Sequence, residues 1–303
     1  MSLFDRAVAS ALPVVPRSVV RRVSAPYIAG ATLDDARRTV ATLNAEGKRA
    51  TVDVLGEEIH TEAEAEAIAA TYRDLLAAIE SDRLDANISV KLTGLGLKLD
   101  VDLCRSLLEG LVRTAGDQGA RVRIDMEDAT CVDDTLALYR ALRADGLDNV
   151  GIVLQASLKR TLGDIEDLRE LRPSVRLCKG IYVEPREIAF HDFEVVQRAF
   201  VSCLEALLDG GSRVAIATHD EHLLVESLAR VGDLAADAYE FQMLLGVRES
   251  RATELVADGH PVRVYVPFGR QWYEYSLRRL QENPRMAGVI AKATVGRAFG
   301  RAG

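Results

Sequence analysis

From residue 32 onward, the chain alternates between two spacings of hydrophobic residues. Short apolar segments that end in glycine or a polar residue predict β-strands, and the stretches between them repeat Leu, Ala and Val at helical spacing. The predicted strands are Ala50–Gly56, Asn87–Thr93, Arg121–Glu127, Gly151–Ala156, Val175–Tyr182, Arg213–His219, Ala238–Leu244 and Val262–Pro267. Helices are predicted near 61–83, 101–117, 132–144, 161–171, 186–209, 220–230 and 248–258, and a last one at Gln271–Glu282.

Eight strand–helix units in succession predict an α/β fold of the (β/α)8 barrel type, with parallel strands. We expect residues 1–46 to form a helical arm outside the barrel and residues 47–303 to form the barrel domain. An open doubly wound sheet is the alternative, but it usually carries a Gly-rich turn after its first strand. Here the first strand ends in Gly56-Glu-Glu-Ile, and Gly94-Leu-Gly96 lacks the third glycine, so the dinucleotide fingerprint is absent.

Polar and apolar residues alternate strictly in several predicted strands. Between Arg121 and Glu127 the odd positions are charged and the even ones apolar, so one face must meet helices and the other must line the barrel interior. The charged side chains that this alternation places inside are Asp53, Lys91, Arg123, Asp125, Glu127, Glu240 and Arg263. Charges buried in this way cost on the order of several kcal/mol each unless they are paired.

Two interpretations of this polar interior stay open: an ionic network that satisfies itself, or a ligand site. Position favours a site, because several polar or contact residues lie at or near the C-terminal ends of strands, the face where barrel enzymes carry their active sites. These residues are Lys91, Asp125, Gln155, His219, Leu244 and Tyr265.

The composition excludes some classes of function. With 303 residues, of which 48% are hydrophobic and 28% charged, the chain can bury a large core. A net charge of -8 gives no indication of a nucleic-acid surface. The four cysteines are widely spaced without a C-x-x-C pair, which fits reduced thiols in a cytoplasmic protein. His219 and His222 have no third ligand nearby, so no metal site is expected.

The N-terminal segment is weakly apolar from Ala7 to Pro16, is interrupted by prolines, and is followed by arginines at 17, 21 and 22. It is too short and too charged for a spanning helix, and it lacks the basic start of a secretion signal. We expect an amphipathic arm, and we expect any contact with the inner face of the cell membrane to be peripheral.

The predicted last helix brings two arginines next to an aromatic ring. Tyr275, Arg278, Arg279 and Glu282 share one helical face, because their separations are three, four and seven. Two guanidinium forks beside a ring suit recognition of a small carboxylate with an apolar body. The alternative interpretation is a solvated pair that offsets the helix dipole, with Glu282 as its partner.

Seven motifs occur in order along the strands and the last helix. They are Ser89-Val-Lys91-Leu, Ile124-Asp125-Met-Glu-Asp, Leu154-Gln155-Ala156, Val175-Arg176-Leu-Cys-Lys179-Gly180-Ile-Tyr182, Ala217-Thr218-His219-Asp220, Tyr239-Glu240-Phe241-Gln242-Met243-Leu244, and the stretch from Tyr265 to Pro284. In these motifs the chain resembles the flavin-dependent proline dehydrogenases, in particular the single-function bacterial enzymes, over residues 30–285. The resemblance implies a distorted (β/α)8 barrel that carries FAD, with its last helix over the flavin.

The resemblance also implies the reaction. Hydride passes from C5 of L-proline to flavin N5, which gives Δ1-pyrroline-5-carboxylate, and a membrane quinone reoxidises the flavin. This is the first step of proline catabolism to glutamate, and a pyrroline-5-carboxylate dehydrogenase is an expected partner. The implied substrate-binding residues are Lys91, Arg278 and Arg279 around the carboxylate and Leu244, Tyr265 and Tyr275 around the ring. Asp125 is implied as a catalytic-site residue, which we expect to orient an arginine rather than to act as a simple base.

For the cofactor, the resemblance places Arg176 near flavin N5, where a cation stabilises the reduced flavin, so this residue counts as catalytic as well as cofactor-binding. The other implied FAD contacts are Met126, Gln155, Lys179, Gly180, Ile181, Tyr182, Thr218, His219 and Glu282. The alternatives are that Lys179 is a structural residue that faces a helix and that His219 is a hydrogen-bonded strand cap.

Three rival functions were weighed against proline oxidation. A Schiff-base lyase would use Lys91 or Lys179 as its amine nucleophile. A non-catalytic binding barrel would not need polar side chains converging on one end. A hydroxyproline dehydrogenase is the nearest neighbour, but Tyr265 stands where the resemblance implies a smaller residue in enzymes that admit the ring hydroxyl.

Overall fold

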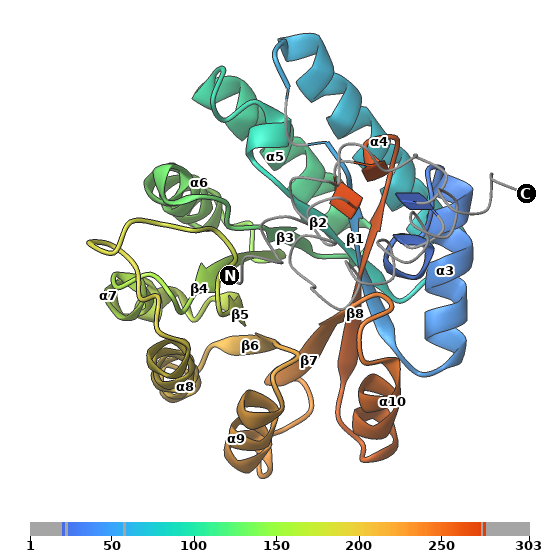
Figure 1. Cartoon of the computed structure of the whole chain (residues 1–303). Coiled ribbons are helices and arrows are strands. Elements are labelled where there is room, and N and C mark those ends of the chain that lie inside the picture. The colour runs from blue at the N-terminus through green and yellow to red at the C-terminus, as the bar shows by residue number, and fades with distance from the viewer. Residues whose placement is uncertain (1–19, 22–23, 57–58, 274, 277–303) are drawn as a thin grey trace, which may run out of the picture.

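A closed barrel of eight parallel strands in chain order forms the centre of the molecule (Figure 1). The structure is a computed structural model that describes residues 20–21, 24–56, 59–273 and 275–276. Its strands are β1 (Arg49–Val54), β2 (Ala86–Val90), β3 (Val122–Ile124), β4 (Val150–Gln155), β5 (Ser174–Cys178), β6 (Arg213–Ala217), β7 (Tyr239–Leu244) and β8 (Val262–Phe268). Since β8 also pairs with β1, the sheet has no edge, and the predicted (β/α)8 barrel is confirmed.

Helices surround the barrel on its outside (Figure 1). They are α3 (Leu33–Ala45), α4 (Glu62–Ser81), α5 (Val101–Asp117), α6 (Val132–Ala144), α7 (Thr161–Leu168), α8 (Phe193–Asp209), α9 (Glu221–Val231) and α10 (Glu249–Ala257). Short 3-10 turns lie at Ala25–Tyr27, Thr93–Leu95, Ala129–Cys131 and Arg169–Leu171. None of the described helices is long and apolar enough to cross a membrane.

The helix predicted at 186–209 is wrong in its first turns. The structure begins α8 at Phe193, because the Asp192 side chain accepts a hydrogen bond from the Val195 amide and so caps the helix there. The residues before it form turns after Pro185. The last predicted helix, Gln271–Glu282, lies mostly outside the described residues, of which Trp272, Tyr273, Tyr275 and Ser276 are helical.

α3 packs directly on β8 and β1, although it belongs to the segment expected as a separate arm (Figure 1). A capping box fixes its start, with the Thr32 hydroxyl accepting from the Asp35 amide and the Asp35 carboxylate accepting from the Thr32 amide. A helix that precedes the first strand therefore covers the seam where the barrel closes. The boundary at residue 46 stays a prediction.

The alternation in the strands separates an apolar layer from a polar interior. The outward side chains Val52, Ile88, Ile124, Ile152, Ile216, Phe241 and Val266 are fully buried and form one apolar cluster with helix residues. The inward side chains Asp53, Ser89, Gln155, Arg176, Glu240, Gln242 and Arg263 are buried as well. Most of the predicted interior charges are thus confirmed inside.

The predicted strands ran past the observed strand ends, most of all in β2, β3 and β5. β2, β3 and β5 end at Val90, Ile124 and Cys178, so Lys91 and Asp125 follow their strands directly instead of lying within them. Glu127, predicted to line the interior, lies beyond the end of β3 and accepts hydrogen bonds from the amide and hydroxyl of Thr93 in the turn after β2. Its carboxylate joins two loops at the C-terminal end of the barrel.

Candidate active site at the C-terminal end of the barrel

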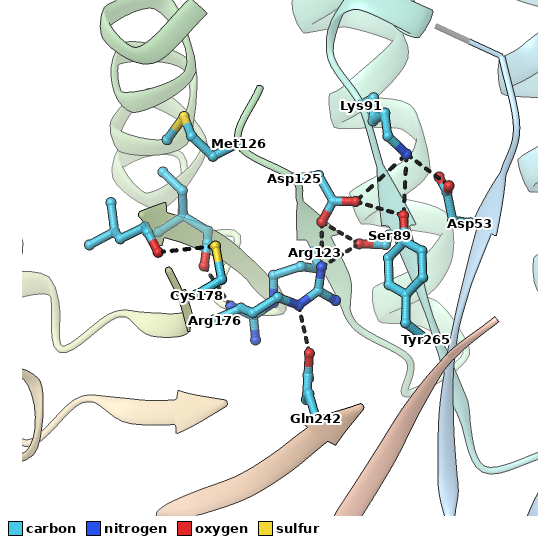
Figure 2. Close-up of polar contacts among 12 residues, drawn as sticks. Asp53, Ser89, Lys91, Arg123, Asp125, Met126, Arg176, Cys178, Gln242 and Tyr265 are labelled. Atoms are coloured by element: carbon cyan, nitrogen blue, oxygen red, sulfur yellow. Dashed lines mark hydrogen bonds and ion pairs between the residues drawn. The ribbon is translucent and has the colours of Figure 1, made fainter. Parts of the chain in front are cut away.

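The Asp125 carboxylate is the centre of a polar network contributed by several strands (Figure 2). Its Oδ1 accepts hydrogen bonds from the Ser89 hydroxyl at 2.7 Å and from Arg176 Nη1. Its Oδ2 accepts from the Tyr265 hydroxyl at 3.0 Å and lies 3.9 Å from Lys91 Nζ. Residues from β2, β5 and β8 thus converge on one carboxylate that directly follows β3.

Lys91 is held by a second, deeper carboxylate. Its Nζ donates to Asp53 Oδ2 at 2.7 Å and to the Tyr265 hydroxyl at 3.2 Å. Asp53 on β1 is fully buried, and burial raises the pKa of its carboxyl although the Lys91 charge opposes the change. Tyr72 on α4 brings its hydroxyl within 3.2 Å of Asp53 Oδ1 and 2.6 Å of the Ser89 carbonyl oxygen. The Lys91 ammonium is therefore fixed from below, with its upper side toward the barrel mouth.

The two buried phenols stay protonated at neutral pH. Burial, together with the neighbouring charge of Asp125, raises the pKa of Tyr265 well above its ordinary value, and burial with Asp53 does the same for the pKa of Tyr72. Because the Tyr265 hydroxyl keeps its proton, it donates to Asp125 while it accepts from Lys91. The protonated hydroxyl therefore fixes the direction of the two hydrogen bonds that Tyr265 makes with Asp125 and Lys91.

Arg176 is a buried cation whose guanidinium is hydrogen-bonded to described residues at only two of its three nitrogens. Its Nε donates to Gln242 Oε1 at 2.6 Å, and its Nη1 donates to Asp125 and, at 3.2 Å, to the Ser89 hydroxyl. Its Nη2 is buried and has no hydrogen-bond partner among the described residues. The Tyr265 ring lies 5.3 Å from the guanidinium carbon. Since a buried donor is costly to leave unpaired, an acceptor on a bound ligand would suit this nitrogen.

Below this layer, the network satisfies itself. Arg263 Nε lies 2.9 Å and 3.1 Å from the two Glu240 carboxylate oxygens, and Gln242 Nε2 donates to Glu240 at 2.6 Å. Burial alone would raise the pKa of Glu240, but the charge and hydrogen bond of Arg263 outweigh it and lower that pKa to about 2. Arg123 donates to the carbonyls of Ile152 and Ser174. This lower part is therefore a structural ionic network. In the upper part, Arg176 Nη2 is a donor without a partner among the described residues.

Candidate cofactor residues lie along the same end of the barrel, after β3 and β4. Gln155, the last residue of β4, is buried and donates from Nε2 to the Glu127 carbonyl at 3.2 Å. Met126 is buried in the loop after β3, and its carbonyl lies 3.5 Å from the same amide nitrogen. The structure thus brings Met126 and Gln155 together beside Asp125, as expected from the sequence.

The loop after β5 carries the next group. Lys179 Nζ bonds Asp220 at 3.0 Å and lies 4.8 Å from the centre of the Phe193 ring. Gly180 has a φ of +101°, and a Cβ there would come within 2.2 Å of the Ser157 hydroxyl, so no other residue fits. Ile181 and Tyr182 are exposed, at 48% and 39%. Both side chains lie in the loop that follows β5.

Thr218 and His219 follow β6. Thr218 is buried, and its hydroxyl accepts from the Asp220 amide at 3.1 Å. His219 Nε2 accepts from the Leu244 amide at 3.0 Å, so its imidazole proton is on Nδ1. His219 therefore caps β7 through Nε2, which is the contact that the alternative interpretation expected.

Part of the predicted site lies outside the described residues. Arg278, Arg279 and Glu282 belong to that part, so their arrangement stays a prediction. Tyr275 is buried and packs with Ile28 and Leu55. Its charge, when ionised, would raise the pKa of Tyr265, so the two phenols are near one another.

Sequence reasoning missed several residues that shape this site. Ser89 and Gln242 lie in the motifs and on inward positions, so strand parity alone would have selected them. Tyr72 comes from the outer face of the barrel, on a helix, and reaches between β1 and β2 to Asp53. No periodicity marks such a residue, because its role depends on how the helix docks.

Comparisons with known proteins show which family and which folds the chain resembles. The sequence model of the family described as proline dehydrogenase matches residues 36–292. The chain is 37% identical over 268 residues to proline dehydrogenase 1 of Bacillus subtilis subsp. natto, and 35% identical over 272 residues to the proline dehydrogenase of Deinococcus radiodurans; each match covers 88% of both chains. Among solved structures, proline utilization A (PutA) from Bdellovibrio bacteriovorus is similar in fold, with a TM-score of 0.80 and 24% identity over 86% of this chain. The match covers 32% of that longer chain.

Proposed function

Because the chain belongs to the proline dehydrogenase family, we propose that it oxidises L-proline to Δ1-pyrroline-5-carboxylate with bound FAD, the first step of proline catabolism. The observation that carries this proposal is the convergence of Lys91, Arg176 and Tyr265 on Asp125 at the C-terminal end of the barrel. This end is where barrel enzymes bind their substrates.

FAD, when bound, accepts the hydride that leaves the substrate. The residues present fit such a group, because Arg176 has a buried donor without a partner among the described residues. Polar and apolar contact groups also surround the same barrel end. The residues that would hold the cofactor are Met126, Gln155, Arg176, Lys179, Gly180, Ile181, Tyr182, Thr218, His219 and Glu282.

Binding of the substrate carboxylate falls to Lys91 with Arg278 and Arg279. A carboxylate that leaves water needs strong donors, and Lys91 offers an ammonium whose side chain is only 14% exposed and is kept charged by Asp53. The apolar ring would lie against Leu244, Tyr265 and Tyr275.

Asp125 positions its neighbours rather than removing a proton. Both of its oxygens already accept hydrogen bonds, from Ser89 and Arg176 on one side and from Tyr265 on the other. These contacts engage both oxygens with the side chains that Asp125 holds in place. We therefore assign loss of the substrate amine proton to solvent, before hydride leaves.

A Schiff-base lyase is disfavoured by the same contacts. Lys91 is paired with Asp53, and Lys179 with Asp220, so each amine already bonds a carboxylate. Hydroxyproline is disfavoured by the buried Tyr265 phenol, whose ring and hydroxyl fill the space between Lys91, Arg176 and Asp125.

For the later fate of the electrons and product, we propose a membrane quinone as acceptor and a pyrroline-5-carboxylate dehydrogenase as the consumer of the product. A quinone is dissolved in the membrane, so a cytoplasmic enzyme would have to touch the inner face of the membrane at least transiently. Peripheral contact meets this need.

An absorption spectrum of the purified protein tests the proposal. We expect a flavin band that bleaches when L-proline is added without oxygen. A colourless protein would refute FAD as the cofactor. A band that persists with L-proline but bleaches with hydroxyproline would refute the assigned substrate. Reduction with borohydride in the presence of substrate provides the test for the lyase, since only a Schiff base would become a stable covalent adduct.

A further inference from the structure

Gln242 links the catalytic layer to the ionic network beneath it. It lies on an inward position of β7 and is buried. Its Nε2 donates to Glu240 Oε1 at 2.6 Å. Its Oε1 accepts from Arg176 Nε, also at 2.6 Å (Figure 2). The amide thus bridges a carboxylate on its own strand and a guanidinium that comes from β5.

Glu240 fixes which way this amide points. Its two oxygens are held by Arg263, and its low pKa keeps it ionised at every pH at which the enzyme would work. An ionised carboxylate only accepts hydrogen bonds, so the NH2 group of Gln242 must face Glu240. The carbonyl oxygen of Gln242 must then face Arg176.

The guanidinium of Arg176 is consequently held at two of its three nitrogens. Asp125 and Ser89 hold Nη1, and Gln242 holds Nε. Two bonds at different nitrogens fix the plane of a guanidinium as well as its position, and this sets the direction of Nη2. Without the bond at Nε, the plane could rotate about the remaining contact at Nη1.

We propose that Gln242 is a positioning residue for the reaction: it fixes the plane of Arg176 so that Nη2 meets the bound substrate and cofactor. This rests on the proposed function. Since Lys91, Arg278 and Arg279 bind the carboxylate, a misaligned Arg176 affects the reacting end of the site rather than capture of the substrate. Loss of Gln242 should therefore lower kcat and leave KM nearly unchanged.

Two substitutions separate positioning from packing. Gln242→Met keeps the length but offers no acceptor to Arg176. Gln242→Glu keeps an acceptor, and as a neutral acid it also donates to Glu240, which reproduces both bonds of the amide. The control is Thr51→Val, an inward and buried position on β1 whose hydroxyl has no hydrogen-bond partner among the described residues.

The charge on the introduced carboxyl depends on its surroundings. Among the described residues, the charged groups that face this part of the barrel are Glu240 on β7, Arg176 on β5, Arg263 on β8, Arg213 on β6, Arg49 on β1 and Arg123 on β3, which donates to the Ile152 and Ser174 carbonyls. Glu240 is the group that contacts the amide nitrogen, so it disfavours a second negative charge there. Apart from Arg123, the arginines are already engaged with carboxylates or, for Arg176, with Asp125 and Gln242. We expect the neutral acid to prevail near pH 6 and to be lost as the pH rises.

Relative to Thr51→Val, we expect Gln242→Met to lower kcat by about tenfold or more, with KM changed by less than about threefold. The bound flavin should become about tenfold harder to reduce, which for a two-electron couple is a midpoint potential about 30 mV more negative. At about pH 6, Gln242→Glu should recover at least half of the loss in log kcat.

Several results would overturn the proposal. One is a kcat and potential of Gln242→Met equal to those of Thr51→Val. Another is a loss in Gln242→Glu as large as in Gln242→Met. If Gln242→Met does not fold, Gln242→Glu decides alone: its activity relative to wild type should fall between about pH 6 and pH 9, and a constant ratio refutes the proposal. If the wild-type protein does not oxidise proline at all, the proposed function has failed instead.

Discussion

Removal of the Lys91 ammonium should destabilise the fold strongly, because it leaves a carboxylate uncompensated in the barrel interior. Asp53 is fully buried, and Lys91 Nζ donates to it at 2.7 Å. Breaking a buried pair by deleting one partner typically costs about 3–5 kcal/mol. For a chain of 303 residues, with an unfolding entropy near 2.1 cal/mol/K per residue, this corresponds to a melting temperature about 5–8 °C lower in Lys91→Met.

A surface pair provides the matched control. Lys98 Nζ lies 3.1 Å from Asp128, but the two side chains are 56% and 37% exposed. Pairs of this kind contribute about 0–1 kcal/mol, so Lys98→Met should lower the melting temperature by no more than about 2 °C. Both variants replace a lysine by methionine, so the difference between their melting temperatures reports the effect of burial.

The double variant Lys91→Met, Asp53→Asn tests the cause. It removes the buried charge as well as its partner, and we expect it to recover most of the stability lost in Lys91→Met. Differential scanning calorimetry and urea unfolding give the three values. The reasoning fails if the double variant is no more stable than Lys91→Met, or if Lys91→Met matches Lys98→Met.

The same loss should depend on pH. The folded-state pKa of Asp53 is already raised above its ordinary value of 3.8, and removal of Lys91 raises it further. The folded protein then binds a proton more tightly than the unfolded chain, so stability falls as the pH rises from 3.8 through the folded-state pKa. The loss of stability in Lys91→Met should therefore be smaller in acid than at neutral pH. The double variant should not show this pH dependence.

Three further predictions concern the reaction. First, kcat/KM for L-proline should rise as the pH increases above neutrality, because hydride loss needs a neutral amine; a flat profile between about pH 6 and pH 9 would contradict this order of events. Second, Tyr265→Ser should shift the ratio of specificities toward hydroxyproline by about 1–3 kcal/mol, and an unchanged ratio would mean that Tyr265 does not line the ring. Third, Arg278→Met and Arg279→Met should each raise the proline KM at least about tenfold with FAD still bound, whereas a solvated surface pair predicts wild-type KM in both.

The order and type of the elements were predictable because each strand and helix of a barrel buries one face. Strand parity carried over even to charged positions, so Asp53, Arg123 and Glu240 were found inside. The strand ends were not predictable. Lys91 and Asp125 continue the alternation past the last paired residue, because side-chain direction persists for a step after the ladder of backbone hydrogen bonds has ended.

The location of the site was easier to predict than the hydrogen bonds that connect its residues. Polar residues at strand ends indicated where a ligand would bind, but nothing local indicates that Gln242 bonds Arg176, 66 positions away in the chain. The same holds for Tyr72, which enters the network from α4. Such contacts are set by how strands are staggered around the barrel and by how helices dock on it.

The charge balance of the barrel interior connects the structural network to the substrate. Among the residues that the structure describes, four cations lie there, namely Lys91, Arg123, Arg176 and Arg263, against three acidic groups, Asp53, Asp125 and Glu240. Asp53 is already paired with Lys91, and Glu240 is paired with Arg263. The described part of the interior therefore holds one more cation than acidic groups. An anionic group that entered from the C-terminal end would reduce this excess, whereas a cation would increase it. A zwitterion would therefore fit this interior with its carboxylate pointing inward, and the cationic surroundings would favour loss of its amine proton, the state from which we propose that hydride leaves.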